Sequence, residues 1–479
     1  MSRKEGMHFF IKYIGVMLMF VSGIILLPVA VLPFFPEENK YLMSFFFPFA
    51  ASFLVGFLMN KTRISDDCRM TVADASLVVV ASWFFAIFFS SLPFVFGKIL
   101  DFPHAFFESA SGWTTTGLSV VDVEKIPRIF LLFRSLSQFF GGLGIVLVVV
   151  SALSETLGMT LFMAEGHTNR LLPNLAFSAR MIIKIYFGYF IAGTVLYMVL
   201  GMTAFEAVNH TMTSLSTGGF STRSPSIGYY DSIPVEILTI ILMFLGSTSF
   251  NAHMLLMGGK VGKFFRLSEF RLSALTAVLS IIMLTCISHF YMNNSLEYSI
   301  RTAVFNSMAA LTTTGFSTTA FDRWPDSAML VMVVLMSAGG QIGSTAGGIK
   351  LERINVVLKE AAWSVRRKFM PEYMANKPLI VRAEGSTPVT AELFAEAATY
   401  VITFMVFLLI GTLSLTACGY SLRDSLFEFA SALGTVGLST GITRFDMPPA
   451  ALWTLTVGMI LGRLEIYVIF YAFMRIFKK

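Results

Sequence analysis

Residues 305–317 read FNSMAALTTTGFS, a short apolar segment that ends in threonines, a glycine, an aromatic residue and a serine. The chain contains three further segments with this pattern: FESASGWTTTGLS (107–119), NHTMTSLSTGGFS (209–221) and FEFASALGTVGLS (427–439). Their final glycines align as Gly117, Gly219, Gly315 and Gly437, and a serine stands two residues after each. Repetition at this scale indicates that one structural unit is used four times.

The composition around the repeats is that of a membrane protein. Of the 479 residues, 55% are hydrophobic and 13% are charged, about half of the roughly 25% charged share of soluble domains. A helix that spans a bilayer needs about 20 mostly apolar residues. Ten segments meet this requirement: 9–32, 42–59, 75–96, 129–154, 180–201, 234–257, 272–292, 328–349, 394–418 and 449–474. The three cysteines are too scattered to predict a disulfide framework or a metal site: Cys68, Cys286 and Cys418.

The positions of Lys and Arg predict the orientation of these spans. With both termini in the cytoplasm, most of the 35 Lys and Arg residues fall on the cytoplasmic side, as the positive-inside rule requires. The cytoplasmic clusters are 3–12, 61–69, 170–184, 260–271, 350–382 and 475–479. We therefore interpret the net charge of +6 as a topology signal rather than as a nucleic-acid site. Each copy of the repeat then lies between two spans on the outer side.

The repeated segments have the properties of re-entrant pore loops. About ten apolar residues precede each final glycine, too few to span the bilayer, so we expect a half-helix that enters from outside. The C-terminal end of such a helix carries a partial negative charge of about half a unit, which stabilises a cation at the membrane centre. Carbonyl and threonine hydroxyl oxygens of the returning stretch can replace a cation's hydration shell. The alternative for any single copy is close helix packing by small residues.

We predict an all-α polytopic membrane protein in which four pseudo-fourfold helix–pore-loop–helix repeats surround one central pore. Two N-terminal transmembrane helices (1–70) precede the repeats, which occupy 71–170, 171–268, 269–392 and 393–479. The third repeat also contains a gate loop and a cytoplasmic segment. The predicted ion-binding filter comprises Thr115, Thr116, Gly117, Thr217, Gly218, Gly219, Thr313, Thr314, Gly315, Thr435, Val436 and Gly437.

The sequence resembles the Trk/Ktr/HKT superfamily of cation transporters, and most closely the bacterial Trk-type K⁺-translocating membrane subunit. The resemblance covers essentially the whole chain. It rests on the motifs STGGFST (216–222), TTTGFST (312–318), SAGGQIGSTAGGIK (337–350) and LGRLE (461–465). The two helices before the first repeat are similar to the Trk branch rather than to the Ktr branch.

This resemblance implies K⁺ uptake across the bacterial inner membrane by a homodimer with one pore per subunit. K⁺ bound in the filter would be the ligand, with no organic cofactor, and a cytoplasmic ring of nucleotide-binding regulatory subunits would control transport. Family members with Ser in place of the first filter glycine tend to favour Na⁺, so Gly117 favours K⁺. A Na⁺-permeable member or an ion-coupled cation symporter of the same fold remains the alternative.

Residues 337–350 lie in the middle of a predicted span but contain five glycines within ten residues. Each glycine costs a helix about 1 kcal/mol relative to alanine, and irregular backbone at membrane depth must face protein or a cavity. We therefore predict a gate formed by Gly339, Gly340, Gln341, Gly343, Ser344, Thr345, Gly347, Gly348 and Lys350. The alternative is a broken helix that is packed for shape alone.

Charged residues at membrane depth are costly and usually face the interior of a helix bundle or water. The resemblance implies that Arg463 lies beside the permeation path, where it forms an electrostatic barrier. The alternative is a structural contact with Glu465 or with carbonyl groups of the gate loop. We expect Arg134 to extend to the outer surface, because long basic side chains do so near helix ends. Glu108 and Glu428 are expected to stabilise half-helix N-termini rather than to bind ions.

Two other classes of function are less well supported. An enzyme within the membrane needs a cluster of catalytic or metal-binding groups, but the six His and three Cys residues are not clustered. Transporters of organic solutes usually contain inverted repeats, whereas these four repeats run in the same direction. The basic stretch 350–393 predicts a docking site for a regulator, a contact with anionic lipid headgroups, or both.

Overall fold

The computed structural model describes residues 3–62, 72–144, 175–369 and 376–477. The end of the predicted span 129–154 lies outside these residues, as do Cys68 and five basic residues of the predicted cytoplasmic clusters: Arg63, Arg69, Arg170, Lys478 and Lys479. The regular secondary structure of the described chain is helical apart from one short antiparallel hairpin. This hairpin consists of β1 (Leu379–Val381) and β2 (Ser386–Pro388), and Ile380 lies opposite Thr387.

The helices of the described residues follow in chain order. The N-terminal pair is α1 (Arg3–Leu26), η1 (Leu27–Phe34), η2 (Pro36–Tyr41) and α2 (Leu42–Asn60). The first two units contain α3 (Val72–Phe96), α4 (Phe102–Trp113), α5 (Arg128–Leu143), α8 (Leu175–Val199), α9 (Ala204–Leu215), η3 (Ser226–Tyr230), α10 (Ile233–Ser247), α11 (Phe250–Met257) and α12 (Val261–Phe264). The last two contain α13 (Ser268–Cys286), η4 (Ile287–Tyr291), α14 (Leu296–Leu311), α15 (Asp326–Ala338), α16 (Leu351–Arg367), α17 (Ala391–Ala417), α18 (Leu422–Leu433), α19 (Pro449–Arg463) and α20 (Ile466–Phe477).

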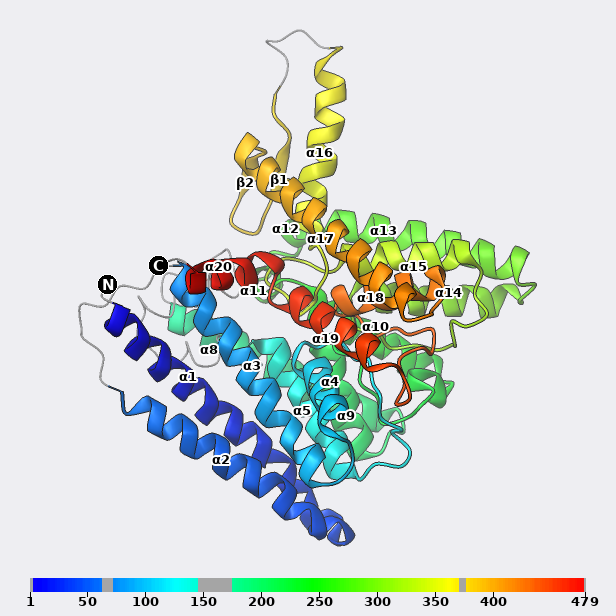
Figure 1. The fold of residues 1–479 in the computed structure, drawn as a ribbon. Helices are drawn as coiled ribbons and strands as arrows, with labels where there is room; N and C mark the ends of the chain where they lie inside the picture. Colours follow the sequence, from blue (N-terminus) through cyan, green and yellow to red (C-terminus); the bar gives the residue numbers. More distant parts are fainter. Residues whose placement is uncertain (1–2, 63–71, 145–174, 370–375, 478–479) are drawn as a thin grey trace.

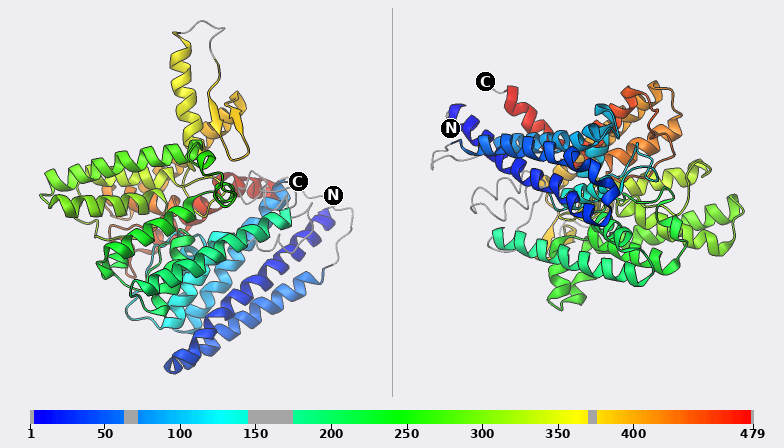
Figure 2. Two further views of the ribbon diagram at one scale, coloured as in Figure 1. Left: turned by 180° about the vertical axis from the view of Figure 1, so that it is seen from behind. Right: turned by 90° about the horizontal axis from the view of Figure 1, so that it is seen from below.

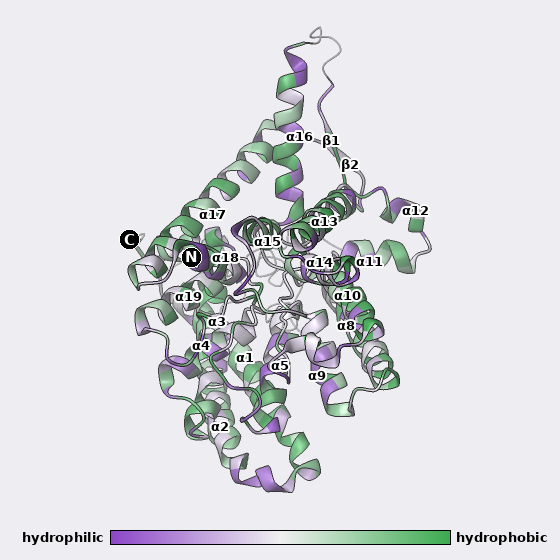
Figure 3. Ribbon diagram, turned by 90° about the vertical axis from the view of Figure 1, so that its right-hand side faces the viewer, coloured by the Kyte–Doolittle hydropathy of each residue, from purple (hydrophilic) through white to green (hydrophobic). Residues whose placement is uncertain are grey.

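This arrangement confirms the predicted fold class of a helical, multi-pass membrane protein. In Figure 3 the short helices α4, α9, α14 and α18 lie on four sides of a common centre, and hydrophobic residues dominate the surrounding helices. Helix α16 and the hairpin project from this helical body (Figures 1 and 2). Hydrophilic residues are concentrated in the loops and along α16 (Figure 3).

Six helical segments of the described chain are long and apolar enough to cross a membrane: His8–Phe34, Pro36–Asn60, Ala73–Phe96, Arg180–Val199, Ser268–Tyr291 and Ala391–Ala417. Two further predicted spans are not continuous. Helices α10 and α11 meet at 110°, and α19 and α20 meet at 95°. The continuous helix predicted at 449–474 is therefore wrong in shape, because Glu465 has a φ of +54°. The bend in 234–257 follows Ser247, next to Gly246, where the sequence indicates a helix break.

The second helix of every repeat ends or bends sharply. Helix α5 ends before Gly144 with a φ of +83°, and α15 ends before Gly339 with a φ of +74°. Together with the bends after α10 and α19, these ends leave four sets of backbone carbonyls without helical partners. In a bilayer such groups must be satisfied by protein or by a water-filled cavity. The breaks therefore determine where the polar centre of the molecule forms.

The N-terminal helices α1 and α2 lie side by side (Figure 1) and approach closely at two glycines. A Cβ atom on Gly15 would lie 2.7 Å from the carbonyl oxygen of Gly56, and one on Gly56 would lie 2.8 Å from the carbonyl oxygen of Gly15. Small residues at such crossings allow the backbones of membrane helices to pack directly against each other.

We predict that Gly56→Ala destabilises the protein by about 1–3 kcal/mol, because the added methyl group forces α1 and α2 apart. Gly23→Ala in α1 is the matched control, since a Cβ atom there would meet nothing within 4 Å. Thermal unfolding of both variants in detergent measures the difference. Equal unfolding temperatures would contradict the close glycine contact.

Candidate functional site

The four predicted loops have the same backbone conformation. After each short helix a threonine has a positive φ of +51° to +56°, which non-glycine residues rarely adopt. These threonines are Thr115, Thr217, Thr313 and Thr435. The final glycine two residues later has a φ between +70° and +98° in each copy. The fourth loop, Gly434-Thr435-Val436-Gly437, departs in sequence but not in backbone conformation.

The final glycines join the loops into a closed ring. A Cβ atom at any of them would lie within 3.0 Å of a carbonyl oxygen of the next loop, so no side chain fits. The contacts run in chain order and return to the start: Gly117 to Gly218, Gly219 to Thr314, Gly315 to Val436, and Gly437 to Thr116. The structure thus brings all twelve predicted filter residues together around one centre.

Each short helix supports the outgoing part of its own loop with one polar side chain. Glu108 accepts a hydrogen bond from Ser119 Oγ (2.9 Å), and Glu428 accepts one from Ser439 Oγ (2.7 Å). His210 Nε2 lies 3.0 Å from Ser221 Oγ, and Asn306 Nδ2 donates to Thr318 Oγ1 (3.2 Å). The two glutamates are structural, as expected, but they act by bracing the loops rather than by stabilising helix N-termini.

Arg134 does not reach the surface, so the sequence-based prediction for it is wrong. Its side chain is 3% exposed, and its Nε donates to Glu108 Oε1 at 2.7 Å. Arg134 also donates to Ser119 Oγ, and its guanidinium carbon lies 3.9 Å from the ring centroid of Phe220. Helix α5 packs behind the first loop, and this packing buries the charge. The acidic Glu108 in an otherwise apolar half-helix was the sequence signal for a buried partner.

The predicted gate loop lies against one side of the ring. Gly347 N donates to Thr313 Oγ1 at 2.8 Å, and Thr345 Oγ1 lies 3.1 Å from Thr217 Oγ1. A Cβ atom on Gly347 would collide with Thr435 Oγ1. Three of the four ring threonines are thus in contact with this loop.

The gate loop also completes the broken end of α10. Gln341 N donates to Ser247 O (3.0 Å), and Thr345 N donates to Gly246 O (3.2 Å). The Gln341 side-chain oxygen accepts from Ser249 N at 3.0 Å. The loop also contacts the start of α13, where Ile342 N donates to Glu269 Oε1 at 2.8 Å. The loop therefore supplies partners for carbonyls that the bend in the span leaves exposed.

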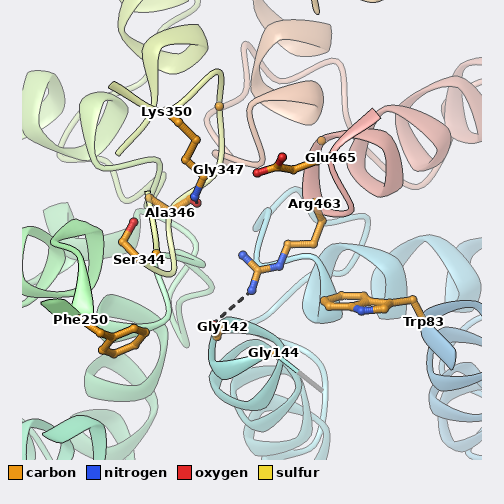
Figure 4. A pocket seen from close by; sticks show the side chains of 13 residues that line it. Trp83, Gly142, Gly144, Phe250, Ser344, Ala346, Gly347, Lys350, Arg463 and Glu465 are labelled. Carbon is orange, nitrogen blue, oxygen red and sulfur yellow. Dashed lines mark hydrogen bonds between the residues drawn. The ribbon is translucent and has the colours of Figure 1, made fainter. Parts of the chain in front are cut away.

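Arg463 connects the gate loop with the broken end of α5. Figure 4 shows its guanidinium group extending toward Gly142. Its guanidinium donates to Thr345 O (2.9 Å), to Gly142 O (3.2 Å) and to Gly141 O. A cation is stabilised at a helix C-terminus by the partial negative charge of the last carbonyls. These contacts match the structural alternative that the sequence left open for Arg463.

Cavities lie on both sides of the ring. A vestibule of about 540 Å³ is lined by the final glycine of every loop and by Arg223 and Asp322. On the opposite side, a cavity of only about 40 Å³ is lined by gate-loop residues, Arg463, Lys350 and Glu465 (Figure 4). Gate-loop residues and Arg463 thus line this small cavity together with two glycines at the end of α5.

Two ring hydroxyls, Thr115 Oγ1 and Thr435 Oγ1, are buried without a hydrogen-bond partner among the described residues. Buried polar atoms are nearly always satisfied, so such atoms indicate a place for water or an ion. In the described chain no three His, Cys, Asp or Glu residues group to hold a metal. Backbone and hydroxyl oxygens are the ligands that this site offers.

We predict that Glu108→Ala destabilises the protein by about 3–5 kcal/mol, because it leaves the Arg134 charge buried without its carboxylate partner. Asp446→Ala is the control, since it removes an ion pair with Arg444 in which both side chains are 67% exposed. Such exposed pairs contribute at most about 1 kcal/mol. Denaturant or thermal unfolding in detergent compares the two variants. Equal stability would contradict the importance of the buried pair.

Comparisons with known proteins agree with this geometry. Residues 41–478 match the TrkH family model, described as a cation transport protein. The chain is 28% identical over 490 residues to the Trk system potassium uptake protein TrkH of Escherichia coli, covering 98% of this chain and 99% of that protein. It is 29% identical over 470 residues to TrkG of the same organism, covering 95% and 96%.

The fold is also similar to a solved structure. The crystal structure of the potassium transporter TrkH from Vibrio parahaemolyticus matches with a TM-score of 0.84 and 26% identity, and the match covers 98% of both chains. The relatives are transport proteins rather than enzymes. The chain described here therefore belongs to the TrkH family of cation transport proteins.

Proposed function

We propose that the protein carries K⁺ into a bacterial cell across the inner membrane, through the ring formed by its four loops. The observation that carries this proposal is the closed contact of each final glycine with a carbonyl of the next loop. The two unpartnered threonine hydroxyls and the open vestibule support it. The names of the relatives, potassium uptake proteins of the Trk system, supply the ion.

In this proposal the twelve filter residues replace the hydration shell of K⁺. Backbone carbonyls of Thr116, Gly218, Thr314 and Val436 stand next to the ring contacts, and ring hydroxyls such as Thr115 Oγ1 add oxygen ligands. The four short helices end at the loops, so their partial negative charges stabilise the ion. Selection of K⁺ over Na⁺ is assigned to the glycine at each final position. A Na⁺-permeable or ion-coupled transporter is the competing function.

The gate loop, from Gly339 to Lys350, is assigned to control passage on the cytoplasmic side of the filter. Its contacts with three of the ring threonines support this role. Arg463 stands next to the loop, and its positive charge would oppose a passing cation until the loop moves. Opening then requires the loss of the hydrogen bonds that tie the loop to α10 and to Arg463.

The remaining assignments concern the assembly. The chain acts as a homodimer. Both of its termini lie in the cytoplasm, an orientation that the distribution of Lys and Arg supports. A cytoplasmic ring of nucleotide-binding subunits regulates it, as the word "system" in the names of its relatives suggests. The repeat boundaries are 71–170, 171–268, 269–392 and 393–479, after two N-terminal helices in 1–70.

Radioactive Rb⁺ uptake into liposomes that contain the purified protein tests the filter. Rb⁺ uptake by the wild type should resist excess Na⁺. In Gly315→Ser, either the rate of Rb⁺ uptake or its preference over Na⁺ should fall by at least about tenfold, which corresponds to about 1.4 kcal/mol in the transport barrier. The matched control is Gly441→Ser. Gly441 has a φ of +93°, so serine meets similar backbone strain there, but a Cβ atom would have no neighbour within 4 Å.

Three results would be informative in this assay. Equal losses in both variants would attribute the effect to backbone strain and contradict the ring. Wild-type uptake that Na⁺ suppresses would favour the competing function. Folded wild-type protein without uptake calls for addition of the regulatory subunits, and continued absence of uptake would then reject K⁺ transport by this chain.

For the gate, we predict that Thr345→Val increases K⁺ flux about fivefold. The variant keeps the side-chain volume but removes the hydroxyl that contacts Thr217 and Gly246, and one hydrogen bond contributes about 1 kcal/mol to the closed state. Deletion of 342–346 should increase flux further and weaken regulation. Thr399→Val, which removes an exposed hydroxyl from α17, is the control. Unchanged flux in folded Thr345→Val and in the deletion would reject a gate at this loop.

A further inference from the structure

A basic pocket lies between α12, the start of α13 and the β1–β2 hairpin, on the side that we assign to the cytoplasm. It has a volume of about 420 Å³ and is lined by four cationic side chains and one acidic side chain. The cations are Lys263, Arg266, Arg271 and Arg382, and the acid is Glu384. Neither the filter nor the gate loop contributes a residue to this pocket.

Most of this positive charge has no acidic partner within the part of the chain that the structure describes. Arg382 is paired with Glu352 (Nε to Oε1, 3.0 Å), and Glu384 is engaged by Asn251 Nδ2 at 2.5 Å. Lys263, Arg266 and Arg271 make no ion pair with any described residue, and Arg271 Nε only donates to a backbone carbonyl, that of Phe265. Four cationic side chains against the single carboxylate of Glu384 leave the pocket with an excess of positive charge, which favours an anionic ligand.

The walls of the pocket are fixed in place. Val381 N in the hairpin donates to Ser268 Oγ at the start of α13, at 2.9 Å. At the tip of the hairpin, Ala383 packs against a small apolar cluster that includes Phe264 and Leu267. The pocket is therefore part of the folded structure rather than a gap between separate loops.

Exposed apolar side chains continue along the same segment. Met257, Val261 and Phe265 are 65%, 46% and 54% exposed, and they alternate along the chain with the basic residues. Helix α13 is a membrane span that begins at Ser268, so the pocket stands at the end of a span, where lipid headgroups lie. Farther along α13, Leu275 and Val278 are also exposed, where acyl chains would contact them. A free phosphate ion would use the cations but not this apolar surface.

We propose that this pocket binds the phosphate headgroup of an anionic phospholipid, whose acyl chains lie along α13 and the apolar residues of α11 and α12. Basic pockets beside membrane helices on the cytoplasmic side suit such headgroups. Segments that combine basic and large apolar side chains lie in the interface of a bilayer for the same reason.

The pocket is connected to the gate loop through two neighbouring carboxylates, Glu269 and Glu352. Glu269, two residues before Arg271, accepts a hydrogen bond from Ile342 N of that loop. Arg382 holds Glu352, which lies in the first turn of α16 directly after the loop. A headgroup that engages Arg271 and Arg382 therefore contacts the elements that hold the gate loop, and its binding should alter flux if the proposed gate is correct.

Native mass spectrometry of the full chain in detergent tests the binding, with phosphatidylglycerol and phosphatidylcholine as probes. The wild type should retain phosphatidylglycerol in preference to phosphatidylcholine. The triple variant Lys263→Gln, Arg266→Gln, Arg271→Gln should bind it about a hundredfold more weakly, since each cation near a bilayer surface contributes about a fivefold effect. The control is Arg366→Gln, Arg367→Gln, Lys368→Gln at the far end of α16, where these side chains are exposed. It should change affinity less than about twofold.

Four outcomes would overturn the proposal. Equal loss in both triple variants would mean general charge attraction, and equal binding of the two lipids would mean no headgroup selection. Displacement of the lipid by an equal concentration of inorganic phosphate would identify a free anion as the ligand. Unchanged lipid binding in the triple variant, with loss only of regulator binding, would identify a protein docking site. If the triple variant does not fold, Arg266→Gln alone should still show the fivefold loss.

A flux measurement separates this site from the transport proposal. K⁺ flux of the wild type should differ between liposomes with and without phosphatidylglycerol, whereas the triple variant should not respond. Lipid binding without any effect on flux would retain the site and reject its connection to the gate. Absence of flux in every lipid even after the regulatory subunits are added, with lipid binding intact, would contradict the transport proposal alone.

Discussion

The structure depends on the contact between each final glycine and a carbonyl oxygen of the next loop. No side chain fits at these four positions, and the positive φ of the threonine two residues earlier is the same in every loop. Because the contacts close on themselves, the four short helices must converge on one centre. The vestibule, the buried polar side chains behind the loops and the position of the gate loop all follow from that convergence.

A second constraint comes from the bilayer, which offers no partners to exposed backbone carbonyls. The second helix of each repeat ends or bends sharply, and the structure satisfies the resulting helix ends in different ways. The gate loop binds the end of α10, and Arg463 binds the end of α5. The same contacts that make broken helices tolerable therefore hold a glycine-rich loop and the charge of Arg463 close to the ring threonines.

Several features were accessible from the sequence because they depend on local chemistry or on repetition. The four short helices, their glycine loops and the glycine-rich interruption at 339–350 follow from apolar length, spacing and helix propensity. Features that depend on packing were missed. Arg134 is buried against Glu108 because α5 passes behind the first loop, and α19 and α20 meet at a bend within a stretch whose apolar residues predicted a continuous span. A hydropathy pattern measures length and polarity, not direction, so it cannot detect a bend.

The sequence by itself determined that this chain crosses a membrane several times and repeats one helix–loop–helix unit four times, because burial in lipid and internal repetition are properties of composition and order. Only the tertiary structure decided which carbonyl each glycine contacts, what Arg463 binds, and that Lys263, Arg266 and Arg271 gather beside the hairpin. Those contacts join residues far apart in the chain. Their geometry is fixed by the packing of whole helices, which no local pattern in the sequence encodes.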